Sequence, residues 1–242
     1  MRDELKIIGF AAVVCIACSL ILSAAYASLK GKQDYNKKID QQFNVLKALG
    51  VEVQNEKGKK VMSNEEVSAL FDQSVESLVL DENGVLLGGV KPEDLEPVTI
   101  AGRGATAKSR YPVYIFKDPK TSQTRYALHI SGKGLWSTLK GYIALDAELE
   151  KIVGITFYEH GETPGLGAEV DQPWFQKQFP GKVLFTGNKQ STFQVMKPAA
   201  PEGAPSAVDS IPGATITSKG VQKFLNSDMA VYNKYLSDLR SR

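Results

Sequence analysis

The chain has 242 residues, enough for one large domain or two small ones with a substantial hydrophobic core. It carries 29 Lys and Arg against 27 Asp and Glu, so its formal net charge is +2. A charge so close to zero gives no electrostatic case for nucleic-acid binding, and no nucleic-acid partner is expected.

An uncharged run over residues 7–29 follows a short N-terminal tail, residues 1–6. At about 1.5 Å per residue in a helix, this run is long enough to cross a hydrocarbon core of about 30 Å. Ala25-Tyr26-Ala27 resembles a processing site, so a cleaved signal peptide is the alternative. We favour a retained transmembrane helix, because the run exceeds the usual apolar segment of a signal peptide, about 7–15 residues. Lysines are more frequent after the run than before it, which alone favours a cytoplasmic C-terminal domain.

Two further helices are predicted after this anchor. Apolar residues recur at helical spacing over residues 34–49 and predict an amphipathic helix that Gly50 ends. Ser63 and Glu66 have the spacing of a capping box, which predicts the start of the next helix.

Strands are predicted from residue 78 onwards. Two apolar runs, 78–80 and 85–87, flank Asn83-Gly84 and predict a β-hairpin. Residues 101–106 are glycine-rich and basic, but they lack the strand–turn–helix context of a nucleotide-binding loop, so a plain loop is expected. Four runs rich in β-branched and aromatic residues then predict an antiparallel sheet: 111–116, 126–130, 141–145 and 152–158.

The end of the chain combines a proline-rich stretch with a last helix. Residues 197–206 predict a linker or surface excursion, and apolar residues at helical spacing from Val221 to Leu236 predict the helix. Because helices precede and follow the strands without alternating with them, the fold class is α+β: a single N-terminal transmembrane helix, then a soluble domain with an antiparallel sheet and flanking helices. Residues 30–100 form a helical and hairpin lead-in region, and residues 101–242 form a further domain.

Two loops carry residues suited to binding a ligand. In residues 131–137, the glycines allow close backbone approach, and Trp136 offers a flat apolar face; the alternative is a core tryptophan beside a bulge. Residues 158–167 place carboxylates, a hydroxyl and glycines in a proline-stiffened loop. His160 with the nearby glutamates is a poor ligand set for structural zinc, so no metal site is expected. No nucleophile motif accompanies the Glu–His pair, so no catalytic residues are assigned.

A turn-to-helix junction follows at residues 209–220. Its helix is expected to begin near Ser218, and a helix start presents unpaired N–H groups and a positive dipole end that suit a phosphate. Thr215 and Thr217 lie where that phosphate would sit. The alternative is an ordinary cap, in which Thr217 or Ser218 caps the helix and Gly213 makes the turn.

This junction resembles the flavinylation motif Asp-x-x-Ser/Thr-Gly-Ala-Thr, on which a flavin transferase esterifies the phosphate of FMN to the threonine. Thr215 matches that threonine, and Pro212 stands where the motif has Ser or Thr. Gly-Leu-Trp-Ser at 134–137 and Glu-Thr-Pro-Gly-Leu-Gly at 162–167 precede it in the order of the FMN-binding domain family, which the C subunit of the sodium-translocating NADH:quinone reductase shares with the G subunit of the Rnf complex. The resemblance covers essentially the whole chain. The length of the chain, and the run Gly167-Ala168-Glu169-Val170 with Trp174, look more like the C subunit of the sodium pump.

The resemblance implies that residues 101–242 are an FMN-binding domain with FMN held covalently by a phosphoester to Thr215. Thr163 and Leu166 are expected to contact the flavin ring, with Trp136 packing at its edge. Glu162 either tunes the flavin potential or holds the Thr163-Pro164 loop, and Asp209 either orients the acceptor or serves recognition by the transferase. The implied cofactor-binding residues are Trp136, Glu162, Thr163, Leu166, Gly167, Asp209, Gly213, Ala214, Thr215 and Thr217.

The resemblance further implies an electron-transfer protein that relays electrons between redox subunits of a sodium-translocating NADH:quinone reductase. Its partners would be the other subunits, the flavin transferase and the bacterial inner membrane, crossed once, with the soluble domain in the periplasm. That orientation goes against the lysine bias, and a large translocated domain overrides small charge differences. The alternatives are a component of an Rnf-type, ferredoxin-linked complex and a membrane-anchored, non-redox assembly module whose Gly-Ala-Thr turn is only a helix cap.

Overall fold

The computed structural model describes residues 2–55, 58–95, 100 and 109–241 and divides the chain into two units, Met1–Gln41 and Gln42–Arg242. The first unit consists of most of helix α1 (Arg2–Ala48). Within the described residues, α1 contains the one stretch long and apolar enough to cross a membrane. The large apolar side chains of residues 7–29, among them Phe10 and Leu22, are exposed, which fits the predicted transmembrane helix.

Helix α1 ends where the sequence predicts. Gly50 has a φ of +79°, which side chains other than glycine rarely adopt. Its N–H donates to the Lys47 carbonyl at 3.1 Å, and the Val51 N–H donates to the Leu46 carbonyl at 3.0 Å. These two bonds form a Schellman motif that satisfies the last carbonyls of the helix.

Helix α2 (Asn64–Ser74) begins at the predicted capping box. The Ser63 hydroxyl accepts a hydrogen bond from the Glu66 N–H at 3.2 Å, and the Glu66 carboxylate accepts one from the Ser63 N–H at 2.7 Å. The capping-box prediction is therefore confirmed.

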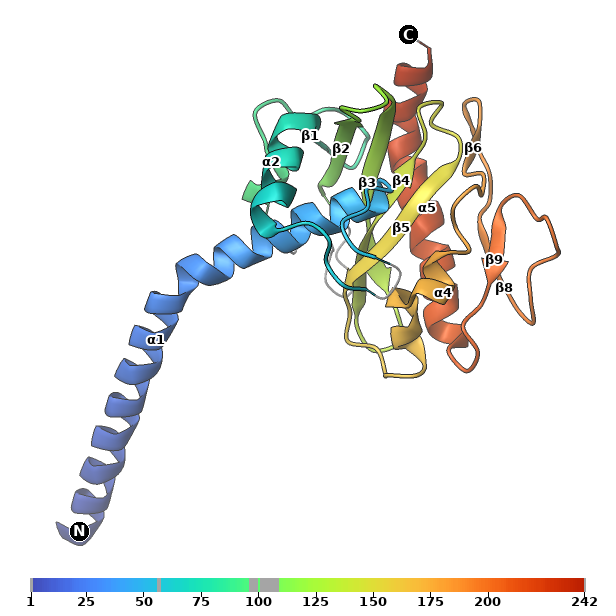
Figure 1. Cartoon of the computed structure of the whole chain (residues 1–242). Coiled ribbons are helices and arrows are strands. Elements are labelled where there is room, and N and C mark those ends of the chain that lie inside the picture. The colour runs from blue at the N-terminus through green and yellow to red at the C-terminus, as the bar shows by residue number, and fades with distance from the viewer. Residues whose placement is uncertain (1, 56–57, 96–99, 101–108, 242) are drawn as a thin grey trace. The chain divides into compact units, whose positions relative to one another are not determined.

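Five strands form one antiparallel sheet in which each strand neighbours the next along the chain (Figure 1). All four predicted runs lie in it. Its edge strand β1 comes from the lead-in region, so the sheet draws strands from both sides of the boundary expected at residues 100/101. The strands are β1 (Val75–Leu80), β2 (Tyr111–Lys117), β3 (Thr124–Lys133), β4 (Thr138–Leu145) and β5 (Ile152–Glu159).

The hairpin predicted at residues 78–87 forms only in part. Its turn is present, with Gly84 at a φ of +75°, and its arms are joined by an antiparallel bridge between Leu80 and Leu86. The Asp81 N–H donates to the Val85 carbonyl at 2.9 Å and the Leu87 N–H to the Val79 carbonyl at 2.8 Å. The predicted hairpin is therefore confirmed over a short length, while β1 pairs along all six of its residues with β2.

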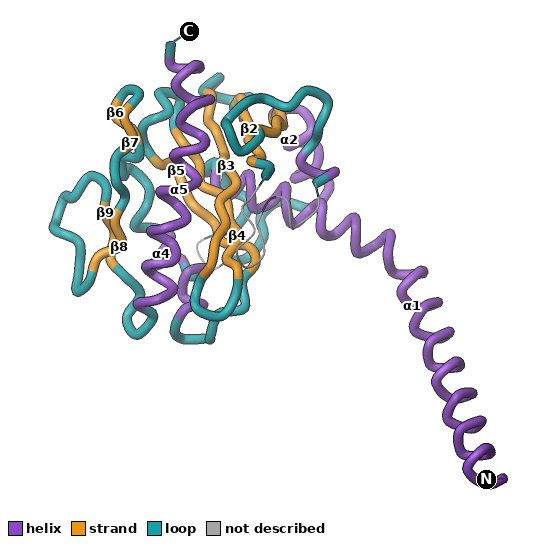
Figure 2. Tube along the Cα trace, turned by 180° about the vertical axis from the view of Figure 1, so that it is seen from behind, coloured by secondary structure: helices purple, strands orange, loops and turns teal. Residues whose placement is uncertain are grey.

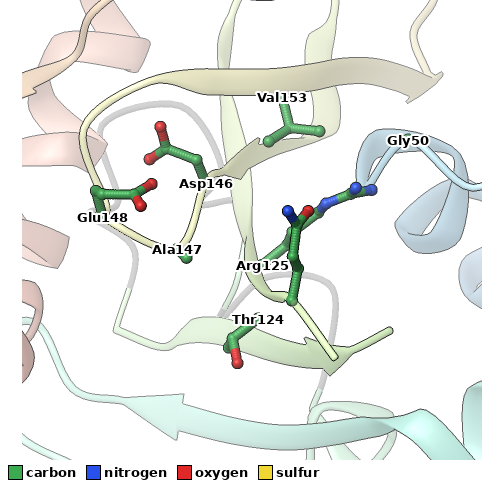
Figure 3. A pocket seen from close by; sticks show the side chains of 8 residues that line it. Gly50, Thr124, Arg125, Asp146, Ala147, Glu148 and Val153 are labelled. Atoms are coloured by element: carbon green, nitrogen blue, oxygen red, sulfur yellow. The ribbon is translucent and has the colours of Figure 1, made fainter. Parts of the chain in front are cut away.

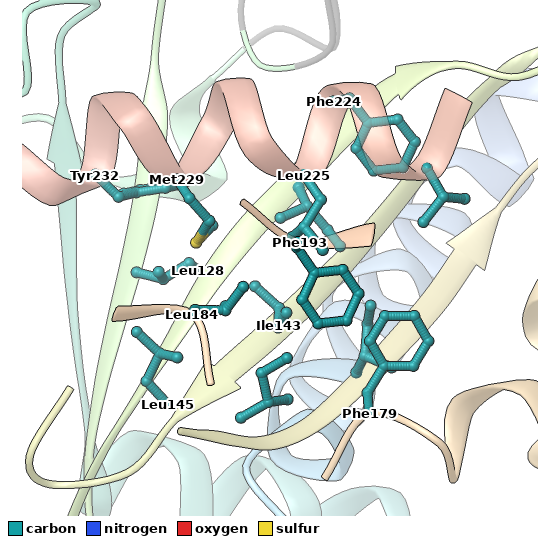
Figure 4. Packing of buried hydrophobic residues seen from close by; sticks show 14 of the residues in the cluster. Leu128, Ile143, Leu145, Phe179, Leu184, Phe193, Phe224, Leu225, Met229 and Tyr232 are labelled. Carbon is teal, nitrogen blue, oxygen red and sulfur yellow. The ribbon is translucent and has the colours of Figure 1, made fainter. Parts of the chain in front are cut away.

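Both faces of the sheet are buried. Strand residues alternate between the faces, so Leu128 and Ile143 contribute to one hydrophobic cluster while Tyr114 and Ala127 contribute to the other. Helix α5 (Thr215–Arg240) packs on the first face (Figure 4), and residues from the end of α1 and from α2 cover the second. Because both faces are covered at the centre of the sheet, the second half of β4 is a continuous apolar run, Tyr142-Ile143-Ala144-Leu145.

Short elements connect β5 to α5. Strands β8 and β9 pair in parallel, so the segments on either side of the predicted excursion over residues 197–206 lie next to each other. The glycine-rich stretch 101–106 lies outside the described residues. The short elements between β5 and α5 are η2 (Gly167–Asp171), α4 (Pro173–Gln176), β6 (Phe185–Thr186), β7 (Lys189–Gln190), β8 (Gln194–Met196) and β9 (Ala207–Asp209). One further short element, η1 (Pro92–Asp94), lies between β1 and β2.

Helix α5 lies along β3 (Figure 2), and its apolar positions read from the sequence are all buried. Those residues are Val221, Phe224, Leu225, Met229, Tyr232 and Leu236. Gly132 in β3 permits the close approach, because a Cβ there would overlap the Phe224 side chain. The N-terminal end of α5 is thereby fixed beside the β3–β4 turn.

Candidate functional site

Three segments that are distant in sequence meet at one end of the sheet. They are the β3–β4 turn, the loop after β5 and the beginning of α5. Gly220 of α5 packs so closely on the turn that a Cβ there would overlap the Lys133 carbonyl. Gly213 lies against the loop, because a Cβ on it would come within 2.8 Å of the Leu166 Cδ2. These are the three segments that carry the predicted site residues.

The carboxylate of Glu162 joins the three segments. Its Oε1 accepts hydrogen bonds from the backbone N–H groups of Trp136 and Ser137 and from the Ser137 hydroxyl, each at 3.0 Å. Its Oε2 accepts from the Leu135 N–H at 3.1 Å and from the Thr217 hydroxyl at 2.7 Å. Glu162 therefore holds the β3–β4 turn and α5 together. The structural role expected for it was to hold the Thr163-Pro164 loop, and none of these five bonds goes to that loop.

This carboxylate is kept ionised by its donors. Glu162 is 6 % exposed, and burial alone would raise its pKa, but the hydrogen bonds from Thr217, Ser137, Trp136 and Leu135 lower the pKa to about 2. Two glycines make room for it: a Cβ on Gly134 or on Gly167 would come within 2.7 Å of a carboxylate oxygen. The glycines of both loops thus serve close packing around one buried charge.

Acid should weaken the fold through Glu162. The folded pKa of about 2 lies below the usual value of 4.5, so the ionised carboxylate stabilises the fold above the unfolded pKa, and this contribution is lost as pH falls from about 4.5 to about 2. Urea unfolding of the unaltered chain and of Glu162→Gln should show a smaller difference in the free energy of unfolding near pH 3 than near pH 7. A difference that stays constant between the two pH values would contradict the assignment.

Helix α5 begins earlier than the sequence predicts. Its first residue is Thr215, and the N-cap is Ala214, which makes no side-chain capping bond. The hydroxyl of Thr217 donates to Glu162, and that of Ser218 accepts from the Ile211 N–H at 3.0 Å. The predicted start near Ser218 and the predicted caps are wrong, because both hydroxyls are engaged by other segments.

Exposed large apolar side chains, together called the apolar rim below, stand on the three segments that meet at this helix start. Trp136 is 69 % exposed, which excludes the core tryptophan considered as an alternative. The other members are Leu135, Leu166 and Ile216, and Thr215 is half-buried. Exposed apolar side chains on segments that meet at a helix start suit a flat, largely apolar ligand with an anionic end.

The other predicted site residues lie close by in the chain but differ in their contacts. Thr163 is exposed, and its carbonyl accepts from the N–H groups of Leu166 and Ala168, both at 3.1 Å. The carboxylate of Asp209 accepts from the Ala200 N–H at 2.8 Å, which closes the 197–206 excursion. Asp209 is therefore tied to the fold of its own segment.

FMN fits this set of residues, since the helix start suits its phosphate and the apolar rim suits its ring. The N–H groups of residues 135–137 are not available to an anion, because all three donate to Glu162. The first turn of α5 has no side-chain cap, and its dipole favours negative charge. Of these two groups of N–H donors, the start of α5 is therefore the one suited to a phosphate.

The sequence reasoning missed Leu135, Ser137 and Ile216. Ser137 bonds both Glu162 and, through its hydroxyl, the Gly161 N–H at 2.8 Å. No local pattern reveals that role, since the partner lies 25 residues away. Leu135 and Ile216 did carry a signal: each is a large apolar residue inside a motif whose neighbours were assigned to the site.

A pocket of about 520 Å³ lies elsewhere, at the end of the sheet where β3 begins and β4 ends (Figure 3). Two of its charged groups, Arg125 and Asp146, are hydrogen-bonded to backbone groups of the fold. Arg125 donates to the Leu49 carbonyl at 2.7 Å, and Asp146 accepts from the N–H groups of Glu150 and Lys151 at 2.9 and 3.1 Å. None of the predicted site residues lines it.

Comparison with known proteins gives concordant results. Residues 134–229 match the FMN-binding domain family. The chain is 32 % identical to the C subunit of the Na(+)-translocating NADH-quinone reductase of Pseudomonas aeruginosa, over 95 % of this chain and 94 % of the relative, and 33 % identical to that of Vibrio alginolyticus, over 90 % and 87 %. The crystal structure of the corresponding C subunit from Parabacteroides distasonis superposes with a TM-score of 0.72 at 31 % identity, covering 86 % of this chain and 97 % of that one. The Shewanella oneidensis NqrC structure gives 0.70 at 26 % identity, covering 84 % and 99 %.

Proposed function

Because the chain belongs to the family formed by the C subunits of the Na(+)-translocating NADH-quinone reductases, we propose that it carries FMN and transfers electrons within such a membrane complex. The observation that carries the proposal is the uncapped start of α5, with Thr215 at its first position beside the apolar rim. Bound FMN would supply the capacity to accept electrons and pass them on.

Thr215 is the proposed attachment residue, through a phosphoester to FMN. Three hydroxyls stand in the first four residues of α5, and they differ in their surroundings. Thr217 is 1 % exposed and donates to Glu162, and Ser218 is 1 % exposed and accepts from the Ile211 N–H, whereas Thr215 is half-buried. The accessible hydroxyl is thus Thr215, and the helix dipole favours the charge that the phosphate keeps after esterification.

The proposed ring contacts are Trp136, Leu166 and Thr163, to which we add Leu135 and Ile216. All five are exposed and stand on segments that Glu162 and the close-packed glycines bring to the same end of the sheet. Their apolar surfaces would pack on the flavin ring and exclude water from part of it. This environment holds the flavin without enclosing it, which suits a carrier that must meet partners.

The proposed setting is a bacterial inner membrane, crossed once by α1, with the soluble unit in the periplasm. The other subunits of the complex would be its redox partners, and a flavin transferase would attach the FMN. The named relatives are C subunits of sodium-translocating enzymes, which favours this complex over an Rnf-type one. The match of residues 134–229 to the FMN-binding domain family favours a flavin carrier over a non-redox assembly module.

The test combines attachment with electron transfer. The full chain is co-produced with a flavin transferase and added to membranes whose NADH-quinone reductase lacks its own C subunit. We expect flavin absorbance to stay with the denatured polypeptide, NADH to reduce that flavin, and quinone reduction to be restored. Stable attachment without reduction by NADH would contradict the proposed relay, and absence of any flavin would contradict the cofactor.

A further inference from the structure

We propose that Glu162 and Thr217 are positioning residues: their hydrogen bonds hold the Trp136 turn and the start of α5 in the arrangement that receives FMN, before any flavin is present. The inference rests on the proposed function for its acceptor, Thr215. It assigns the two residues a role in assembling the site, in place of the contact with the flavin that the sequence motif suggests.

The two carboxylate oxygens of Glu162 bind different segments. Oε1 takes three donors from Trp136 and Ser137 and so fixes the turn. Oε2 takes the Leu135 N–H and reaches across to the Thr217 hydroxyl, the shortest bond of the set at 2.7 Å. Thr217 lies two residues after Thr215, so this bond sets how the first turn of α5 faces the Trp136 turn.

Glu162 has no capacity left for a ligand. A carboxylate offers about four lone-pair positions, and five donors already converge on this one. The residue is 6 % exposed and Thr217 is 1 % exposed. Both therefore act on a bound flavin only through the segments that they hold.

Substitutions that keep the side-chain volume but remove a hydrogen bond test whether the hydrogen bonds, and not the volume, carry this role. In Glu162→Gln the side chain keeps its shape, but one acceptor oxygen becomes an amide NH₂, which would face the donors of either the turn or Thr217. In Thr217→Val the hydroxyl is removed at constant volume, and Thr217→Ser restores it. Asp146→Asn is the matched control, because Asp146 also accepts two backbone N–H groups of a turn, at the far end of the sheet.

The first experiment measures hydrogen–deuterium exchange in the flavin-free chain. We expect the amides of residues 135–137 to exchange at least tenfold faster in Glu162→Gln and in Thr217→Val, and at the unaltered rate in Thr217→Ser and Asp146→Asn. Unaltered exchange in the first two variants would overturn the inference. This readout requires no flavin, so it stands apart from the proposed function.

The second experiment measures the initial rate at which a flavin transferase loads the chain, by intact mass, at a temperature where every variant is folded. We expect at least a tenfold loss of rate in Glu162→Gln and Thr217→Val, rescue by Thr217→Ser, and the unaltered rate in Asp146→Asn.

Unaltered loading of Glu162→Gln and Thr217→Val would overturn the inference. If the unaltered chain itself takes no flavin, the proposed function fails and the exchange measurement decides the positioning role. If Glu162→Gln does not fold, the pair Thr217→Val and Thr217→Ser decides it.

Discussion

Thr215→Ala should emerge from co-production with a flavin transferase without covalent flavin, whereas the unaltered chain should gain the mass of FMN less water. The reason is that the substitution removes the one accessible hydroxyl at the start of α5, since Thr217 is buried and bonded to Glu162. Intact mass and in-gel flavin fluorescence measure the effect, which is a complete loss of the attached cofactor.

Two control variants accompany that experiment. Thr215→Ser keeps a hydroxyl at the same backbone position and should keep measurable attachment. Thr186→Ala removes an exposed hydroxyl from β6, outside the converging segments, and should load like the unaltered chain. An adduct on Thr215→Ala, or an adduct mapped to a peptide that lacks residue 215, would show that another residue is the acceptor.

Phe179→Ala should lower the free energy of unfolding by about 3–5 kcal/mol. Phe179 is fully buried and lies beside Phe193 (Figure 4), with ring centroids 5.5 Å apart. Its ring centroid is 5.3 Å from that of Phe175. Truncation loses the transfer free energy of the ring and leaves a cavity in the hydrophobic cluster around Phe179, which rigid neighbours fill only in part. Urea unfolding followed by circular dichroism gives the value.

Leu86→Ala is the matched control for that measurement. Leu86 is also a large apolar residue, but it is 47 % exposed, so its truncation should change the free energy of unfolding by no more than about 0.5 kcal/mol. Equal losses for the two variants would mean that the cluster around Phe179 does not pack as described.

Local signals predicted much of the fold. The capping box at Ser63, the glycine stop at Gly50 and the buried stripe of α5 each depend on residues a few positions apart, and the structure contains all three. The choice of β2 as the partner of β1, and the parallel pairing of β8 with β9, depend on segments that the chain brings together only when it folds. No turn signal specifies such pairings.

In the candidate site, too, the features that depend on local motifs were predicted and those that depend on distant segments were not. Motif order located the three segments that meet, and the assignments of Thr215 and of the ring contacts stay predictions to be tested. The partners of Glu162 were not predicted, because a carboxylate reveals nothing in sequence about donors that lie 25 to 55 residues away. The start of α5 was placed too late because Ala214 gives no capping signal and the hydroxyls that do are used elsewhere.

Helix α5 follows all five strands of the sheet in the chain, and it both covers one face of the sheet and bears Thr215. During synthesis that face stays uncovered until residues 215–240 have been made, so the domain cannot complete its folding before then. The proposed acceptor therefore comes into being together with the finished fold. A copy that fails to dock α5 would lack the proposed loading site, so flavin attachment at Thr215 would mark the molecules whose folding is complete.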